Sequence, residues 1–217
     1  FITGLYTKYS NTIKVAKGDV GIKPGYDHFA TMHILNSKKG TFFIGDTLIN
    51  RHPGTNTLVD VARLMEGAVR VFNHEPVMAM ASYSNFGSDS VGSPAEVHEA
   101  VRILQEEDPS RLIDGEMQIN IALDKELRDR KYPFTRLRGK DVNTLVFPNL
   151  SSANMASKLI QYMSPEVEVI GPLQIGLNKP IHFTDFESSV RDIVTITAVA
   201  AIDAIVSKRK CTENCLI

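Results

Sequence analysis

Residues 82–88, with the sequence SYSNFGS, combine the groups that proteins use to bind an anion. The segment holds three serine hydroxyls, a side-chain amide and a flexible glycine, and backbone N–H groups in such a loop can also point at a phosphate. We therefore predict phosphate-binding roles for Ser82, Ser84, Asn85 and Ser88. The segment does not end in the Lys-Ser/Thr pair of a nucleotide-binding loop. An ordinary polar loop after a strand is the alternative interpretation.

A lysine and an amide four residues apart form a second candidate. Asn154 and Lys158 occur in the segment FPNLSSANMASKL, where this spacing puts both on one face of a helix, close to its start. The two side chains suit a phosphate group that lies between them. A solvated lysine that binds no ligand is the alternative.

The segment GPLQIGLNKP at residues 171–180 is rich in glycine. Gly171 and Gly176 would allow the backbone to approach a ligand closely, and Lys179 is the only cationic residue of the segment. The same composition is also typical of a purely structural loop.

Carboxylates at two places could do acid–base chemistry. Asp114 and Glu116 lie one residue apart in the segment DGEMQ. Such a pair either transfers protons or fixes a loop and a helix end through backbone N–H groups. Asp192 falls in the first turn of the last predicted helix, where the helix dipole favours a carboxylate whether or not it acts as a base.

Alternating strands and helices are predicted to position these segments. The apolar pattern indicates strands at residues 29–36, 41–46, 77–81, 112–115, 144–147 and 167–170. It indicates helices at residues 55–72, 94–107, 120–130, 152–163 and 189–208. This order predicts an α/β fold, with a mainly parallel sheet covered by helices and one antiparallel hairpin turning at residues 37–40. Because ligands bind beyond the carboxyl ends of parallel strands, we expect the candidates at one edge of the sheet.

The composition excludes several classes of function. The 217 residues are 43% hydrophobic and carry a net charge of −1, so no basic surface favours nucleic acid or a membrane. The longest apolar run, residues 193–202, is too short to span a bilayer. Six scattered histidines and the lack of a CxxC pair indicate no metal site. With only Cys211 and Cys215, both in the tail, we expect a reduced, cytoplasmic protein.

Taken together, four segments carry a resemblance to a known family. They are SYSNFGS, DGEMQ with Ala122 shortly after it, FPNLSSANMASKL, and GPLQIGLNKP followed by the final helix. Their order and approximate spacing resemble the phosphate acetyl/butyryltransferase family, over residues 4–204. SYSNFG, VNTLVFPNL and the opening GLYTKYSNTIK are most similar to the carboxy-terminal transferase-like region of large NADP-dependent malic enzymes.

The resemblance implies a fold of two α/β lobes, similar to isocitrate dehydrogenase-like folds, with a cleft between them. Residues 1–184 would form the second lobe, and residues 185–217 would form a carboxy-terminal helix that belongs to the first lobe, plus a tail. The chain opens at Phe1 in what resembles mid-domain sequence, so we expect a piece of a longer protein. The resemblance also implies an acyl-CoA or phosphate ligand, acetyl-CoA or CoA in particular, and a homo-oligomer. NADP and a divalent metal would bind upstream, with no cofactor in this piece.

The resemblance also carries a departure at the expected catalytic position. Active members move an acetyl group between coenzyme A and phosphate, with Ser-Arg just before the last helix and an Asp base six residues after the Arg. Asp192 matches the base, whereas Asp185 and Phe186 stand where the Ser and Arg belong. Deleting such a charge-stabilising donor costs about 3 kcal/mol, or roughly 10²-fold in rate.

We therefore expect a catalytically silent module that senses acetyl-CoA and helps to hold an oligomer together. One alternative is an active phosphate acetyltransferase that uses Asp192 with Lys158 and Ser82. Another is a purely structural oligomerisation domain whose pocket has lost its ligand.

Overall fold

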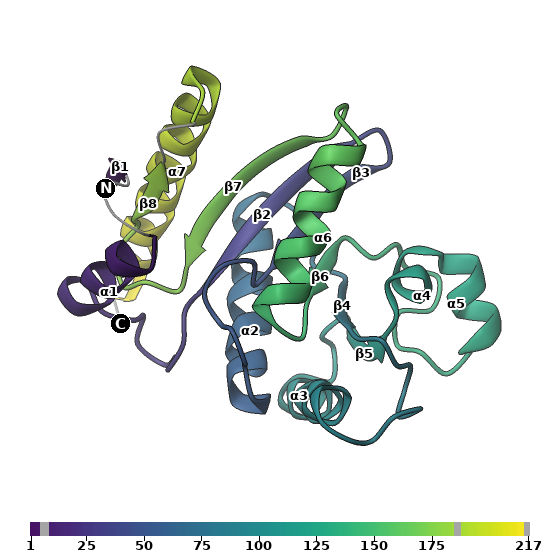
Figure 1. The fold of residues 1–217 in the computed structure, drawn as a ribbon. Coiled ribbons are helices and arrows are strands. Elements are labelled where there is room, and N and C mark those ends of the chain that lie inside the picture. The colour runs from purple at the N-terminus through teal and green to yellow at the C-terminus, as the bar shows by residue number, and fades with distance from the viewer. Residues whose placement is uncertain (5–8, 185–187, 215–217) are drawn as a thin grey trace.

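The computed structural model describes residues 1–4, 9–184 and 188–214, without the side chains of residues 10 and 209–214. A six-stranded sheet forms the centre of the fold, and helices lie on both of its faces (Figure 1). The strand order is β5-β4-β6-β3-β2-β7. The strands are β2 (Ala30–Ser37), β3 (Gly40–Gly45), β4 (Met78–Ala81), β5 (Ile113–Met117), β6 (Thr144–Val146) and β7 (Glu168–Ile175).

Strands β3, β6, β4 and β5 pair in parallel, and β2 pairs antiparallel with both β3 and β7. The sheet is therefore mixed and mostly parallel, which confirms the predicted fold class and its hairpin. The second antiparallel pairing, between β2 and β7, gives β7 the same direction as β3. The carboxyl ends of five strands consequently meet at one edge of the sheet.

Two helices cover one face of the sheet and three cover the other (Figure 1). On the first face are α2 (Thr55–Val71) and α3 (Ser93–Glu107), and on the second are α4 (Ile119–Leu123), α5 (Lys125–Lys131) and α6 (Leu150–Met163). The alternation of side chains along a strand explains both cores. In β4, Met78 and Met80 pack under α2 and α3, whereas Ala79 and Ala81 face the second core.

The remaining elements pack beside β7. They are α1 (Tyr9–Asp19), α7 (Val190–Asn214) and a parallel pair of short strands, β1 (Ile2–Gly4) and β8 (His182–Thr184). Helix α7 turns Ile196, Val199 and Ala200 inward and runs alongside β7 and β8 (Figure 1). Of the residues that the structure describes, none forms a helix with the length and apolar character needed to cross a bilayer.

Three local predictions were wrong in their boundaries. The Gly-Pro segment after residue 170 is not a loop, because Gly171–Ile175 continues β7. The strand expected at 112–115 extends to Met117 and therefore contains Asp114 and Glu116. The helix expected at 120–130 divides at Asp124, whose carboxylate accepts the Leu127 N–H at 2.9 Å and so starts a new helix.

Two other sequence expectations lie outside the described residues. The proposed lobe boundary between residues 184 and 185 adjoins the segment 185–187, and the side chains of Cys211 and Cys215 are likewise not described. The division into lobes therefore stays a prediction.

Arg128, in the middle of α5, is fully buried and holds the segments before and after this helix in place. Its guanidinium donates to the carbonyl oxygens of Ala122, Leu137 and Lys140, at 2.9, 2.9 and 2.6 Å. A planar guanidinium with several donors can satisfy carbonyls from separate segments at once. The residue is thus a structural anchor.

We expect Arg128→Ala to destabilise the fold by about 3–5 kcal/mol, because it leaves three carbonyls without their donor and opens a cavity. Arg130→Ala, on the exposed side of the same helix, should change stability by less than about 0.5 kcal/mol. Urea unfolding followed by circular dichroism measures both. Equal, small effects would contradict the anchoring role.

Candidate functional site

A buried chain of hydrogen bonds lies at the carboxyl edge of the sheet, on the face that α6 covers. Thr31 and His33 project from β2 to this face, since Met32 and Ile34 between them enter the opposite core. The Thr31 hydroxyl donates to Asp46 Oδ1 at 2.7 Å and shares a hydrogen bond with the Thr47 hydroxyl at 3.0 Å. Thr47 Oγ1 in turn lies 2.9 Å from His33 Nδ1.

Asp46 fixes the loop that follows β3. Its carboxylate accepts the Thr31 N–H at 2.9 Å, the Asn50 N–H at 2.6 Å and the Asn50 side-chain amide at 2.7 Å, besides the N–H groups of two further loop residues. So many donors leave this carboxylate no free lone pair for chemistry. Asp46 thus orders the site and does not act as a base.

Helix α6 brings two predicted ligand residues to this chain of hydrogen bonds. The Asn154 amide lies 3.5 Å from the Thr47 carbonyl oxygen, and Lys158, one turn further along, is close enough to act electrostatically on His33. The helix is aimed at the site by its own start, where the Asn149 side chain accepts the Ser152 N–H at 2.9 Å.

Gly171, on β7, packs directly against the His33 side chain. Its φ is +130°, and a Cβ there would lie 3.0 Å from His33 Cδ2 and 2.9 Å from the Met32 carbonyl oxygen. Only glycine therefore lets β7 pack against the imidazole. Lys158 and Gly171 thus lie next to His33, and Asn154 contacts Thr47, the hydrogen-bond partner of His33.

His33 is held in its neutral form. Burial, and to a smaller extent the nearby positive charge of Lys158, lowers the pKa of the imidazole from its usual 6.5 to about 4. A neutral imidazole donates at one nitrogen and accepts at the other, so His33 can orient a ligand without adding charge.

Asp192 lies in a separate cleft, beside β7. Its Oδ2 accepts both the Ser189 N–H at 2.8 Å and the Ser189 hydroxyl at 2.7 Å, while its own N–H donates to Ser189 Oγ at 3.2 Å. These reciprocal bonds form a capping box at the start of α7. The cleft measures about 380 Å³ and is lined by Gly171 as well as Asp192, so Gly171 contributes to both places. The neighbouring Arg191 pairs with Glu168.

The positions of Asp185 and Phe186 fall in the segment that the structure does not describe. The consequence of these two substitutions therefore stays a prediction from the sequence.

The SYSNFGS loop is occupied by one of the protein's own carboxylates. Glu116, which is fully buried, accepts the Ser84 hydroxyl at 2.6 Å and the Gly87 N–H at 2.8 Å, and its other oxygen lies 3.1 Å from His98 Nδ1. An external anion would have to compete with this carboxylate for the same donors. The structure thus gives Glu116 the loop-fixing role that was one of the two interpretations.

The other predicted residues of this loop are engaged within the loop or next to it. Ser82 Oγ accepts the Ser84 N–H at 3.3 Å and Ser88 Oγ accepts the Asn85 N–H at 3.0 Å. Asn85 Oδ1 accepts the Gln118 N–H at 2.9 Å. Their binding of a phosphate stays a prediction.

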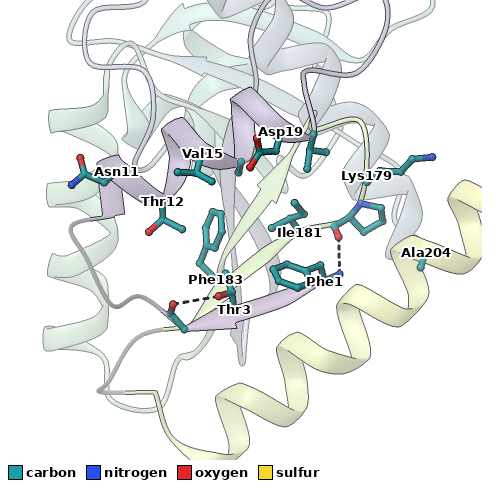
Figure 2. A pocket seen from close by; sticks show the side chains of 14 residues that line it. Phe1, Thr3, Asn11, Thr12, Val15, Asp19, Lys179, Ile181, Phe183 and Ala204 are labelled. Atoms are coloured by element: carbon teal, nitrogen blue, oxygen red, sulfur yellow. Dashed lines mark hydrogen bonds between the residues drawn. The ribbon is translucent and has the colours of Figure 1, made fainter.

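Gly176 and Lys179 lie apart from the His33 group. Gly176, with φ +91°, is packed so closely on α2 that a Cβ would lie 2.6 Å from Leu64 Cδ1. Lys179 lies at the rim of an apolar pocket of about 810 Å³, whose wall includes Val15 and Phe183 (Figure 2). This pocket is formed by α1, β1, β8 and α7, and its apolar wall does not suit a phosphate.

The geometry supports binding through polar contacts. Lys158 and Asn154 supply donors for an anionic or carbonyl oxygen, and His33 supplies an uncharged polar wall. Among the side chains that the structure describes, no three of His, Cys, Asp or Glu come together in a way that could hold a metal ion.

Comparison with known proteins defines the family. The family described as phosphate acetyl/butaryl transferase matches residues 1–201. The chain belongs to this family. The resemblance inferred from the four sequence segments is therefore confirmed.

The curated relatives include enzymes of two kinds. The chain is 33% identical over 203 residues to the NADP-dependent malic enzyme of Escherichia coli, covering 94% of this chain and 27% of that protein. It is 31% identical over 204 residues to the phosphate acetyltransferase of Nitratidesulfovibrio vulgaris, with 94% of this chain and 29% of that protein covered. The chain thus spans less than a third of the length of these relatives.

A solved structure gives the same answer for the fold. A phosphotransacetylase from Streptococcus pyogenes superimposes with a TM-score of 0.87 at 29% identity, over 94% of this chain and 62% of that one. The chain is therefore a phosphotransacetylase-like domain, similar to the corresponding region of malic enzymes.

The sequence interpretation missed His33 and Thr47. A signal was present, because His33 and Thr31 alternate with apolar residues in a strand that is otherwise hydrophobic. A polar residue on the buried face of a strand needs a partner. The partners come from the loop after β3, and no spacing rule identifies them.

Acid should destabilise the protein partly through His33. Its pKa is about 4 in the fold and about 6.5 in an unfolded chain. The unfolded state therefore binds the proton first as the pH falls below about 6.5. Stability from this group is complete above that pH and falls until the folded pKa is passed, a loss of about 2 kcal/mol at pH 5.

We expect His33→Asn, which stays neutral, to lose about 2 kcal/mol less stability than the wild type between pH 7.5 and pH 5. Urea unfolding at the two pH values measures the difference. His52→Asn, at an exposed position, should behave as the wild type does. An unchanged pH dependence in the His33 variant would contradict the neutral, buried imidazole.

Proposed function

We propose that this domain binds acetyl-CoA or a related acyl-CoA, does not transfer the acyl group, and helps to hold a malic enzyme together as an oligomer. In the longer protein it would regulate the oxidative decarboxylation of malate to pyruvate, which requires NADP and a divalent metal bound elsewhere. The similarity to NADP-dependent malic enzymes over 94% of the chain supports this placement.

The observation that carries the proposal is the pattern of hydrogen bonds made by the Asp192 side chain. A catalytic base needs a carboxylate oxygen directed at the proton that it removes. Asp192 uses Oδ2 to cap α7 through Ser189, so one of its two oxygens is committed to the helix start. Arg191, the nearest cation in sequence, pairs with Glu168 and so is not a ready substitute for the arginine that Phe186 replaces.

Binding draws support from a different set of residues. Lys158 is exposed and has a positive charge beside the polar wall of His33 and Thr47. Asn154 lies on the same helical face. These groups suit a phosphate or thioester oxygen, and binding does not require a base.

Calorimetry with acetyl-CoA and the full-length protein tests the binding part. Lys158→Ala should weaken binding about 10- to 100-fold, because one charged hydrogen-bond donor is lost. Lys131→Ala, an exposed lysine at the end of α5, serves as the matched control and should bind normally. No heat of binding in the wild type would remove the sensing role.

Arsenolysis of acetyl phosphate in the presence of CoA tests whether the domain transfers an acetyl group. We expect a background rate in the full-length protein, and the same rate in Asp192→Asn, because the carboxylate serves the helix cap. A robust rate that falls at least about 100-fold in Asp192→Asn would instead establish the alternative function, an active phosphate acetyltransferase. The similarity to phosphate acetyltransferases favours that alternative.

A further inference from the structure

A hydroxyl, an imidazole and a carboxylate form a chain of hydrogen bonds on α2, the helix that covers the face of the sheet opposite α6. Thr57 and Asp60 lie three residues apart on this helix, so their side chains are on the same side of it. His28, in the segment before β2, lies between them. Its Nδ1 is 3.0 Å from Asp60 Oδ2, and its Nε2 is 3.2 Å from Thr57 Oγ1. We call these three residues the Thr57 triad.

The carboxylate fixes the direction of both hydrogen bonds. Asp60 Oδ2 also accepts the backbone N–H groups of Asp27 and His28, at 3.1 and 3.2 Å. An ionised carboxylate can only accept hydrogen bonds, so His28 Nδ1 carries the proton and Nε2 of the neutral imidazole has a free lone pair. The Thr57 hydroxyl therefore donates to Nε2.

Holding the segment before β2 in place does not require this second hydrogen bond. Asp60 already fixes the backbone of that segment through two N–H groups. Thr57 lies on the same helix as Asp60, so its bond to His28 ties no further part of the chain. What the bond adds is a hydroxyl whose proton is directed at a basic nitrogen.

The three side chains are ordered from the interior of the protein to the solvent. The Asp60 side chain is 10% exposed and that of His28 is 37% exposed, while Thr57 is partly exposed. Arg63 approaches the other oxygen of Asp60, Oδ1, at 3.6 Å and pairs with Glu107 as well. Oδ2 is thus left to the imidazole, and a small molecule can reach the hydroxyl from solvent.

This order of groups is the arrangement by which enzymes activate an oxygen nucleophile. The imidazole removes the hydroxyl proton, and the carboxylate holds the correct tautomer and stabilises the imidazolium that forms. Thr57 also lies in the first turn of α2, where Gly54 has no side chain to occupy the free N–H groups. Negative charge on a substrate oxygen would be stabilised there by these groups and by the helix dipole.

We propose that the Thr57 triad is a catalytic site, separate from the candidate site near His33, that hydrolyses small carboxylic esters through an acyl-threonine intermediate. Because the triad is open to solvent, it suits a small acyl group. The activity uses none of the residues proposed to bind acetyl-CoA and goes beyond the proposed function.

Two successive displacements make up the reaction. Thr57 Oγ1 attacks the carbonyl carbon of the ester while its proton passes to His28 Nε2. The bond from that carbon to the leaving oxygen breaks, and the leaving alcohol takes the proton from Nε2. Water then attacks the acyl-threonine with the same transfer of a proton through Nε2, which releases the carboxylic acid and restores the Thr57 hydroxyl. Asp60 remains ionised throughout.

Covalent trapping in the full-length protein tests the nucleophile directly. Diisopropyl fluorophosphate forms a P–O bond with an activated hydroxyl and releases fluoride, and mass spectrometry should find the label at residue 57. His28→Gln should slow this labelling about 100-fold or more, because the general base is lost. Thr197→Val is the matched control, since the Thr197 hydroxyl on α7 donates to a backbone carbonyl, and it should be labelled as the wild type is.

Turnover of p-nitrophenyl acetate by the full-length protein tests the reaction. We expect release of several equivalents of p-nitrophenolate, which separates hydrolysis from the single acetylation of a lysine. Thr57→Val should lower the rate about 100-fold or more, whereas Thr57→Ser should keep the activity because it keeps a hydroxyl. Thr57 is partly exposed, so both variants should fold, and their circular dichroism and acetyl-CoA affinity should match those of the wild type.

Each other result overturns the proposal. No label at residue 57, or equal turnover in the wild type and Thr57→Val, would show that the hydrogen bonds serve the structure alone. A label that His28→Gln leaves unchanged would refute the imidazole as the base. A label at residue 57 without turnover would refute the hydrolysis, and an inactive Thr57→Ser would refute the hydroxyl as the nucleophile.

Discussion

The carboxylate of Asp46 is the constraint on which the edge of the sheet depends. It lies at the end of β3, accepts the backbone and side chain of Thr31 on β2, and accepts the N–H groups that turn the chain towards α2. Burying a carboxylate is costly unless its lone pairs are satisfied, and here they are. The result is a fixed position for Thr47, from which the imidazole of His33 and the amide of Asn154 are both oriented.

Two further carboxylates in the domain accept hydrogen bonds from its own donors. Glu116 receives the donors of the SYSNFGS loop, and Asp192 receives those of Ser189. An incoming anion would have to compete with each of these carboxylates for the same donors. By contrast, Lys158 is exposed beside a neutral histidine. This contrast is the physical basis of our proposal that the domain binds a ligand without transferring an acyl group.

The sequence predicted the order and type of the sheet elements because their apolar periodicity is strong. The sequence-based prediction of element boundaries failed where a residue type has a different role in the fold from its usual one. A Gly-Pro pair is typical of a turn, but Gly171 is required within β7 because His33 leaves no room for a Cβ. Asp124 divided one expected helix in two by capping the second. Helix α1 was not predicted because its apolar pattern is weak.

Contacts between distant parts of the chain were beyond any spacing rule. Strand β1 pairs with β8 although about 180 residues separate them, and each is three residues long. The same holds for the candidate site. Asn154 and Lys158 could be paired from the sequence because they share a helical face, whereas their neighbour His33 lies about 120 residues away and was not foreseen.

The period of the α-helix gives α6 two separate surfaces. Asn154 and Lys158 face the polar chain of β2, and Met155 and Leu159, each one residue further on, are rotated by about 100° to the outside. The positions of Asn154 and Lys158 thus belong to the candidate site, whereas the exposed apolar side chains of Met155 and Leu159 lie outside it. A substitution on one face of α6 consequently leaves the side chains of the other face in place. The contribution of Lys158 to ligand binding can therefore be separated from that of the outer surface of the same helix.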